Sequence, residues 1–162
     1  MLNDNLNYRE VKVKLLEHFD QSFHLPQYQT QLAAGADIRL CLEPLLRDSL
    51  LKIQPWERVA LPTGLAFEIP IGFEIQVRPR SGLSLKTGLM LLNSPGTIDA
   101  DYRGELKVLM INNSPHIVEL NHGDRIAQLV LMPVWIADFK IVEHELSPTE
   151  RGERGFGSTG LN

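Results

Sequence analysis

Cysteine is nearly absent from this chain. Cys41 is the only one among 162 residues, so no disulfide can form within the chain. The same count argues against a zinc-dependent deaminase, because that kind of metal site needs a pair of cysteine ligands. Nothing here calls for an oxidising compartment, and a cytoplasmic protein is the default expectation.

Long apolar runs are missing as well. The most apolar stretch, residues 129–137 (LVLMPVWIA), is too short to span a bilayer and contains a proline. The opening residues, MLNDNLNYREVKVKLL, lack the apolar core of a signal peptide. We therefore expect no membrane partner.

The chain also has no excess of positive charge. Sixteen Lys and Arg against twenty Asp and Glu leave a net charge of −4, which excludes broad attraction to nucleic acid. A polyanionic ligand would need local arginines, backbone N–H groups or a neutralising metal. With 43 % hydrophobic and 22 % charged residues, the sequence is typical of one globular domain with an adequate core.

Short alternating segments punctuated by Gly and Pro dominate the chain. Val11–Leu15, Ala36–Leu42 and Phe73–Arg78 alternate with period two, which is the pattern of half-buried strands. Further strands are predicted at Glu57–Leu61, Leu65–Ile69, Glu105–Asn112, His116–Leu120, Ile126–Met132 and Phe139–His144. This series predicts an all-β sandwich or barrel. One short helix is expected at Ser81–Thr87, with Ser81 as a possible N-cap.

One predicted strand is apolar on nearly both faces. Leu106–Ile111 (LKVLMI) has a single charged side chain, although one face of a sandwich strand is normally wet. Either this is a fully buried central strand, or its second face meets another subunit. The run itself favours neither reading.

Two segments combine a turn with groups that bind anions or need polar partners. In residues 78–83 an Arg-Ser-Gly sequence opens a helical turn, where backbone N–H groups are free and Arg80 could fork onto phosphate oxygens. In residues 123–129 alternation puts Arg125, Ala127 and Leu129 on one face and Gln128 among apolar residues on the other. A buried amide needs a partner, which is either a ligand or the backbone.

Two further segments carry carboxylates and glycines. In residues 92–104, Asn93 and a Pro-Gly turn predict a hairpin, and Asp99 and Asp101 share a side if the chain stays extended. Such a carboxylate can act as a general base or attract a hydrated metal, or it can simply be solvated. Residues 151–160 hold four glycines around a lone Phe156, so they either fold over a ligand or form a frayed terminus.

Taken in order, these segments resemble the five motifs of the dUTPase family. The motifs are Ala34–Arg39, Pro79–Leu83, Gly96–Gly104 with Asn93 upstream, Gly123–Gln128 and Arg151–Gly160. The resemblance implies Mg2+-dependent hydrolysis of dUTP to dUMP and pyrophosphate, which keeps uracil out of DNA and supplies dUMP for dTMP synthesis. It also implies an all-β, jelly-roll-like subunit of the β-clip dUTPase-like fold, in a homotrimer with shared interfacial sites.

The resemblance further implies a domain boundary and the roles of individual residues. Residues 1–146 would form the domain, and residues 147–162 a flexible glycine-rich arm that closes over the nucleotide. Asp99 would orient and deprotonate the water that attacks the α-phosphorus. Mg2+ would be held by the triphosphate and waters with no direct protein ligand, and Asp37 would contact metal-bound waters.

Substrate contacts follow from the same motifs. The phosphates would meet Arg80, Ser81, Gly82 and Gln128, and the closing arm would add Arg151, Gly157, Ser158 and Thr159. The uracil edge would be read by Asn93, Thr97 and Ile98, with Phe156 stacked on the ring. Tyr102 would lie under the deoxyribose and leave no room for a 2′-hydroxyl group.

The chain departs from the family pattern in places, and rival readings exist. Ala36 stands where a larger residue is frequent, Arg154 where many members have Gly, and the loop Glu43–Ile53 is longer than the shortest members need. A related dCTP deaminase would need a Glu where Leu109 stands. A nucleotide-binding protein without turnover would not need the complete catalytic set. A lectin-like jelly roll would leave the glycine-rich tail unexplained.

Overall fold

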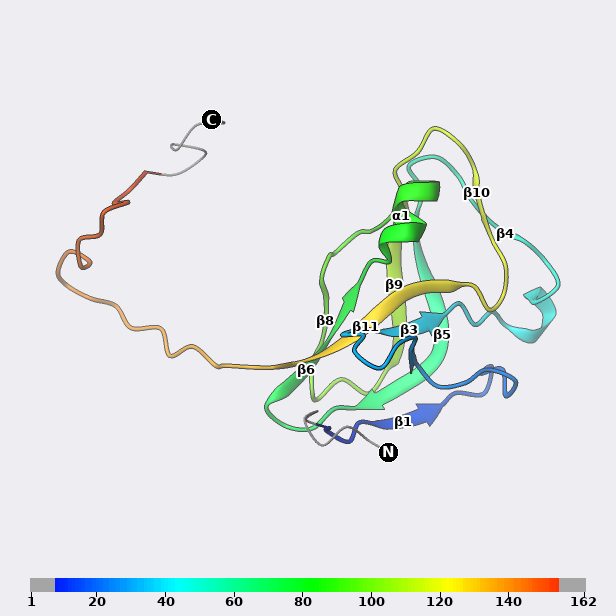
Figure 1. Cartoon of the computed structure of the whole chain (residues 1–162), viewed down its shortest axis with the longest axis horizontal. Helices are drawn as coiled ribbons and strands as arrows, with labels where there is room; N and C mark the ends of the chain where they lie inside the picture. Colours follow the sequence, from blue (N-terminus) through cyan, green and yellow to red (C-terminus); the bar gives the residue numbers. More distant parts are fainter. Residues whose placement is uncertain (1–7, 155–162) are drawn as a thin grey trace.

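The computed structural model describes residues 8–154, which form eleven strands and two short helical segments in three antiparallel sheets. One sheet has the strand order β1-β5-β9-β7, a second has β2-β3-β11-β6-β8, and β10 pairs with β4 (Figure 1). The strands are β1 (Lys12–Leu15), β2 (Gln27–Tyr28), β3 (Ala36–Arg39), β4 (Leu51–Ile53), β5 (Arg58–Glu68), β6 (Phe73–Arg78), β7 (Leu89–Leu91), β8 (Gly96–Ile98), β9 (Glu105–Asn112), β10 (Val118–Leu120) and β11 (Arg125–Pro133). The helical segments are η1 (Pro44–Leu46) and α1 (Ser81–Thr87). The prediction of an all-β subunit with one short α-helix is confirmed.

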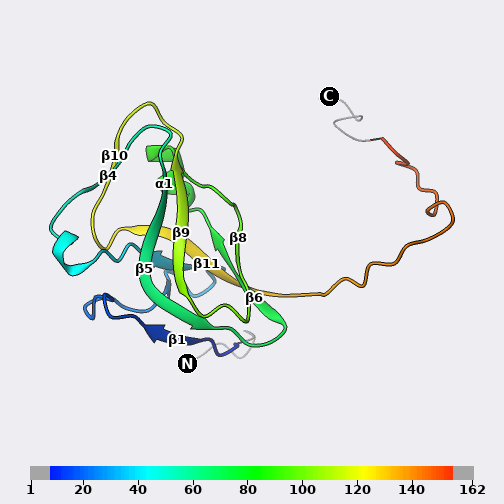
Figure 2. The ribbon, with the colours of Figure 1, turned by 180° about the vertical axis from the view of Figure 1, so that it is seen from behind.

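Apolar side chains from the two larger sheets form one core. On β9 the alternate residues Leu106, Val108 and Met110 are buried, and on β6 so are Ile75 and Val77. Seen from behind, β5 and β9 lie side by side in front of β11 (Figure 2). The predicted strands Phe73–Arg78 and Glu105–Asn112 therefore coincide with observed ones, because period-two alternation matches the pleat.

The long strand β5 spans most of two predicted strands, Glu57–Leu61 and Leu65–Ile69, which are therefore one strand. Pro62 and Gly64 lie inside it, where the pairing with β9 shifts register between Pro62 and Ala66. The Glu105 carboxylate accepts the N–H groups of Thr63 and Gly64 at 3.1 and 2.9 Å, so the bulged backbone is satisfied without a regular ladder. A proline that seemed to end a strand therefore only marks a bulge.

A second bulge alters β11. The pairing with β3 shifts between Arg125 and Ala127, and both Ile126 and Ala127 are fully buried. Strict alternation had placed Arg125 and Ala127 on one face and Ile126 on the other, and this prediction is wrong. One extra residue in the strand changes which side each neighbour points to.

The helix α1 occupies the predicted residues but begins differently. Arg80 is the N-cap and makes no side-chain capping bond, so the expectation that Ser81 caps the helix is wrong. Ser81 is instead the first helical residue, and Gly88, with φ of 76°, ends the helix in the left-handed conformation. No helix among residues 8–154 is long and apolar enough to cross a membrane.

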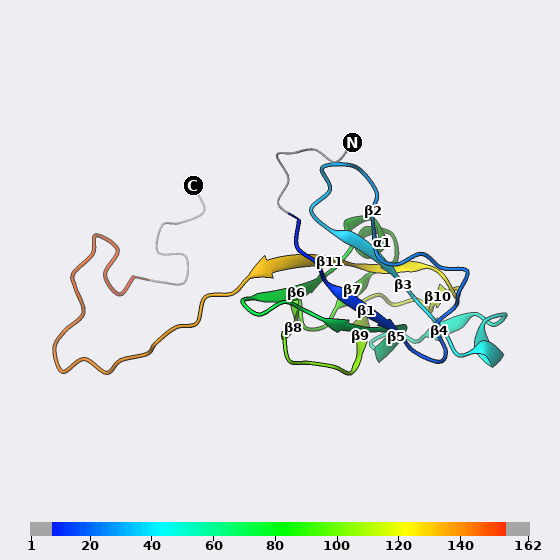
Figure 3. The same ribbon diagram turned by 90° about the horizontal axis from the view of Figure 1, so that it is seen from below.

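Beyond β11 the described chain leaves the body as an extended segment (Figures 1 and 3). The predicted strand Phe139–His144 is wrong, because residues 134–154 contain no strand. Their apolar side chains have no facing strand in a single chain, and Trp135 and Ile141 are 93 % and 99 % exposed. The division at residues 146 and 147 stays a prediction.

The structure excludes one of the two interpretations of the apolar strand β9. Leu106, Val108 and Met110 face the core, while Lys107 and Leu109 are exposed on the other face. β9 is central in its sheet, yet within the described chain its second face is only partly covered. The fully buried reading is therefore excluded for a single chain.

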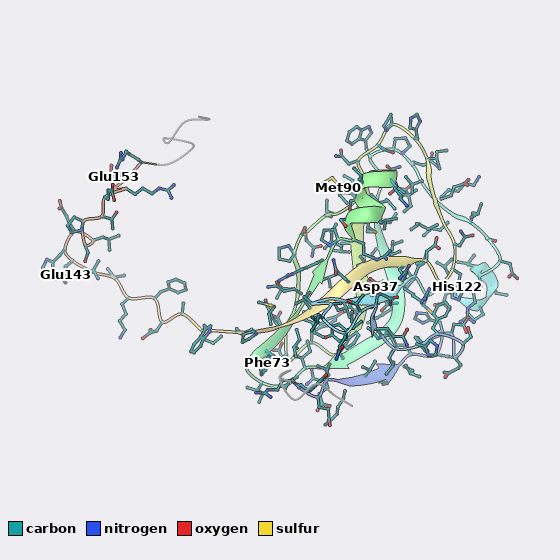
Figure 4. The ribbon with its side chains drawn as sticks, in the orientation of Figure 1. Asp37, Phe73, Met90, His122, Glu143 and Glu153 are labelled. Carbon is teal, nitrogen blue, oxygen red and sulfur yellow. The ribbon has the colours of Figure 1, made fainter. Side chains whose placement is uncertain are left out.

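A polar cluster ties the N-terminal segment to the body near η1, where Figure 4 shows His122. His122 Nε2 lies 3.0 Å from the Asp20 carboxylate, and its Nδ1 accepts the Leu42 N–H at 3.0 Å. Arg47 adds an ion pair to Asp20 at 3.2 Å. Because Leu42 donates to Nδ1, the proton of neutral His122 lies on Nε2 and points to Asp20.

Candidate active site

Residues of the first four motifs line two separate hollows in one chain. The first, of about 250 Å3, we call the Arg80 hollow; its lining is Gln29, Ala33, Gly35, Asp37, Arg80, Ser81, Gly82 and Gln128. The second, of about 440 Å3, we call the Tyr102 hollow; its lining is Val77, Asn93, Gly96, Thr97, Ile98, Tyr102, Glu105, Lys107 and Leu109. The two sets share no residue.

A carboxylate held by two arginines lies at the Arg80 hollow, where Figure 4 shows Asp37 in the middle of the body. Arg80 Nε donates to Asp37 Oδ1 at 2.9 Å, and Arg125 donates to Oδ2 at 3.0 Å. Arg80 also donates from NH1 to the Arg125 carbonyl oxygen at 3.1 Å. Two of the three guanidinium nitrogens of Arg80 are thus engaged, and its NH2 group is left for a ligand.

The neighbouring strands bring Gln128 to the same hollow. Gln128 on β11 pairs with Asp37 on β3 and with Arg78 on β6. Its amide donates to the Pro79 carbonyl at 3.0 Å, so the buried amide finds its partner in the backbone. Gly35 is required beside it, because a Cβ there would lie 2.9 Å from Gln128 Cδ.

Strand β8 forms one wall of the Tyr102 hollow, but not as a hairpin. β8 pairs with β6, whereas β7 pairs with β9 in the other sheet, so the predicted hairpin around Asn93 is wrong. The buried Leu89 and Leu91 keep β7 on the opposite sheet, and the chain crosses between sheets at residues 92–95. Gly96 leaves room for Asn93, whose amide nitrogen would lie 3.3 Å from a Cβ at that position.

The two carboxylates after β8 do not share the side of an extended strand. The chain turns after Ile98, and the Tyr102 N–H donates to the Asp99 carbonyl at 3.2 Å. Asp99 and Asp101 are both exposed. Asp99 lies in sequence between Ile98 and Tyr102, which both line the Tyr102 hollow. Asp99 itself lines neither hollow, and its side chain is open to water.

Tyr102 is oriented by the backbone around it. Its hydroxyl group donates to the Glu105 carbonyl oxygen at 3.0 Å, while its ring is 46 % exposed and borders the hollow. The ring lies against Gly104, where a Cβ would be 2.7 Å from Tyr102 Cζ. Any side chain at position 104 would displace the ring.

Three lining residues come from β9 and were not predicted as site residues. Glu105, Lys107 and Leu109 are two apart, so they share one face of the strand. Lys107 Nζ lies 3.5 Å from Glu105 Oε2. Period-two alternation after the third motif gives their common face, but the sequence does not show that this face borders the site.

Of the predicted arm residues the structure describes only Arg151, which lines neither hollow. Arg151 is exposed, and its Nε donates to the Arg154 carbonyl at 2.8 Å in a local turn. Figure 4 shows Glu143 and Glu153 on the extended chain beyond β11, away from the body. Phe156, Gly157, Ser158 and Thr159 lie outside the described residues.

Comparison with known proteins identifies the family. The dUTPase family model matches residues 21–160. The chain belongs to the dUTPase family. A deoxyuridine 5′-triphosphate nucleotidohydrolase of Bdellovibrio bacteriovorus is 54 % identical over 151 residues, which cover 93 % of this chain and 95 % of that protein. A protein of the same name from Dinoroseobacter shibae is 55 % identical over 141 residues, covering 87 % and 90 %.

Solved dUTPase structures share the fold. The dUTPase of Staphylococcus bacteriophage 80alpha with dUpNHpp superposes with a TM-score of 0.78 at 30 % identity, covering 95 % of this chain and all of that chain. The dUTPase of phage phi11 of S. aureus, in a mutant described for its coordination of a structural Mg(II) ion, gives a TM-score of 0.69 at 27 % identity, with coverage of 84 % and 98 %. The family resemblance and the predicted fold class are confirmed.

Proposed function

We propose that this protein hydrolyses dUTP to dUMP and pyrophosphate with Mg2+. The observation that carries the proposal is the pair of hollows, one with an oriented arginine and one bounded by a tyrosine and the β8 backbone. The first suits a chain of phosphates and the second a pyrimidine deoxynucleoside. The names of the dUTPase relatives support the same substrate.

The Arg80 hollow supplies donors for phosphate oxygens. Arg80 presents its free NH2 group, and Ser81 and Gly82 present the unpaired N–H groups of the first helical turn. Gln128 borders the same hollow. On closure of the arm, Arg151, Gly157, Ser158 and Thr159 add donors around the terminal phosphates.

The Tyr102 hollow selects the nucleoside. Asn93 and the backbone of Thr97 and Ile98 read the uracil edge, and cytosine is rejected because it would leave buried polar groups unpaired. The Tyr102 ring packs under the deoxyribose and excludes a 2′-hydroxyl group. Phe156 stacks on the uracil when the arm closes.

Asp99 acts as the general base. A water held at its carboxylate attacks the α-phosphorus, and its proton passes to Asp99 as the new phosphorus–oxygen bond forms. The bond from the α-phosphorus to the oxygen bridging to the β-phosphorus breaks, and pyrophosphate leaves. The exposed position of Asp99 gives that water access.

The residues fit a metal that the substrate itself holds. Within residues 8–154 no three His, Cys, Asp or Glu side chains are grouped as a metal site. Both oxygens of Asp37 are engaged by arginines, so its contact with metal-bound waters would use the remaining lone pairs. When bound, Mg2+ neutralises negative charge on the pyrophosphate leaving group.

A homotrimer with shared sites accounts for the separation of the hollows. Neither hollow holds both the phosphate donors and the residues around Tyr102, which supports a site completed by a second copy. The second face of β9 carries Leu109, 37 % exposed, and the neighbouring strand β7 carries Met90, 46 % exposed, opposite Ile111. Apolar side chains on a central strand are typical of a subunit interface. In a cytoplasmic setting the reaction keeps uracil out of DNA and supplies dUMP for dTMP synthesis.

A nucleotide panel tests the activity. We expect dUTP to yield pyrophosphate and dUMP with Mg2+, and UTP, dCTP and dTTP to yield little; chelation of the metal should abolish turnover. Sedimentation should give three times the mass of the chain. Release of ammonia from dCTP would restore the deaminase reading, and tight binding of dUTP without pyrophosphate would indicate a binding protein without turnover.

A further inference from the structure

We propose that Arg125 is a positioning residue for Arg80, acting through Asp37. The inference rests on the proposed function, in which Arg80 binds phosphate. Arg125 does not line the Arg80 hollow, whereas Asp37 and Arg80 both do. Its contribution to the reaction therefore passes through other groups.

The contacts form a closed chain of three residues. Arg125 donates to Asp37 Oδ2 at 3.0 Å, Asp37 Oδ1 accepts from Arg80 Nε at 2.9 Å, and Arg80 NH1 donates to the Arg125 carbonyl at 3.1 Å. The Asp37 side chain is only 11 % exposed, so water competes weakly for its oxygens. Arg125 thus holds Arg80 in two ways, directly through its own carbonyl oxygen and indirectly through the Asp37 carboxylate.

The geometry at Asp37 shows why a second arginine is needed. A guanidinium group prefers to bind a carboxylate with two parallel N–H···O bonds. With Oδ2 held by Arg125, Asp37 takes Arg80 through Nε alone and leaves its NH2 group free. Without Arg125, Asp37 could turn both oxygens onto Arg80 and compete with phosphate for the same donors.

Charge leads to the same conclusion. One carboxylate between two guanidinium groups leaves the cluster with an excess positive charge, which favours a polyanion. Loss of the Arg125 charge would leave a neutral Arg80–Asp37 pair at the hollow. The bulge between Arg125 and Ala127 lies at this point of β11, and bulges often re-aim a side chain next to a site.

The test is a double-mutant cycle in the full chain. We expect Arg125→Gln to raise the KM for dUTP and the Kd for the non-hydrolysable analogue dUpNHpp about tenfold, the usual size for one charge-assisted hydrogen bond. The preference for dUTP over UTP should stay unchanged, because Arg125 is not at the Tyr102 hollow. In an Asp37→Asn background, Arg125→Gln should change KM less than about twofold, because the intermediary is gone.

Two further variants separate positioning from charge and from folding. Arg125→Lys keeps the charge and one donor, so KM should lie between wild type and Arg125→Gln. Lys86→Gln removes one positive charge from exposed Lys86 of α1 and should leave KM within about twofold of wild type. Melting curves check folding, and if Arg125→Gln does not fold, Arg125→Lys carries the cycle with Asp37→Asn.

The outcomes are distinct. Equal KM values for Arg125→Gln, Lys86→Gln and wild type would overturn the inference. So would full additivity with Asp37→Asn, because Arg125 would then act independently of Asp37. Failure of the wild-type protein to release pyrophosphate from dUTP would instead overturn the proposed function.

Discussion

The phenol ring of Tyr102 occupies the space that a side chain on Gly104 would need. A Cβ at position 104 would lie 2.7 Å from Tyr102 Cζ, and the ring's hydroxyl group is tied to the Glu105 carbonyl at 3.0 Å. The absence of a side chain at Gly104, two positions along the chain, therefore leaves room for the ring that borders the Tyr102 hollow. This relationship leads to the first prediction.

Gly104→Ala should weaken discrimination between dUTP and UTP. The added methyl group pushes the Tyr102 ring out of its place, so the room for a 2′-hydroxyl group increases and the ratio of kcat/KM values should fall about tenfold. Tyr102→Ala should lower the ratio at least as far. Tyr102→Phe, which keeps the ring and loses only the bond to Glu105, is the matched control. An unchanged ratio in both Gly104→Ala and Tyr102→Ala would contradict the role of the ring.

Asp99→Asn should stop the chemistry and spare binding. The amide cannot accept the proton of the attacking water, so single-turnover release of pyrophosphate should slow by about 10²–10⁴. The Kd for dUpNHpp should change little, because Asp99 is exposed and lines neither hollow. Asp101→Asn, two residues along the same turn, should be near wild type. Normal turnover in Asp99→Asn would rule out this base.

Deleting residues 151–162 should leave a folded, poorly active protein. The described part of this segment is exposed, and within residues 8–154 the side chains of Arg151 and Arg154 bond only to one another's backbone and to that of Glu150. The melting temperature and the number of subunits in the assembly should therefore match those of the full chain. Activity should fall about a hundredfold, because the groups that close on the phosphates are gone. Loss of the assembled state on deletion would show that the segment serves structure instead.

Asp20→Asn should destabilise the protein at neutral pH and make it less sensitive to acid. Hydrogen bonds from Ser22, followed by the one with His122, hold the pKa of the Asp20 carboxyl well below its usual range. The pKa is lower in the folded state than in the unfolded state, so this stabilisation is fully present above about pH 4. It is lost as pH falls further towards the folded-state pKa.

Thermal melts at several pH values check the Asp20 prediction. The variant should melt about 4 °C below wild type at pH 7, and the gap should narrow below about pH 4. His122 and Arg47 also face Asp20, and both remain in the variant. Asp48→Asn, at an exposed position of the same loop region, is the control and should melt with wild type. A gap that does not depend on pH would assign the effect to packing rather than charge.

Local pattern sufficed for several of the regular elements. The strand Phe73–Arg78, the strand Glu105–Asn112 and the helix Ser81–Thr87 were predicted at their observed bounds, since period and turn residues act over a few positions. Arg80, Ser81, Gly82 and Gln128 line one hollow, and their assignment to phosphate stays a prediction. The predicted strand Phe139–His144 failed because its alternation has no partner within the described chain.

By itself the sequence determined the all-β class, the family and the order of the motifs, because these depend on residue type and spacing along the chain. Only the tertiary structure decided that β8 pairs with β6 instead of β7, and that Arg125 reaches Asp37. Strand pairing and bulges depend on contacts between residues far apart in the chain, such as the 88 positions between Arg125 and Asp37. No local pattern encodes that distance, since the competing pairings bury similar side chains and differ only in how the whole core fits together.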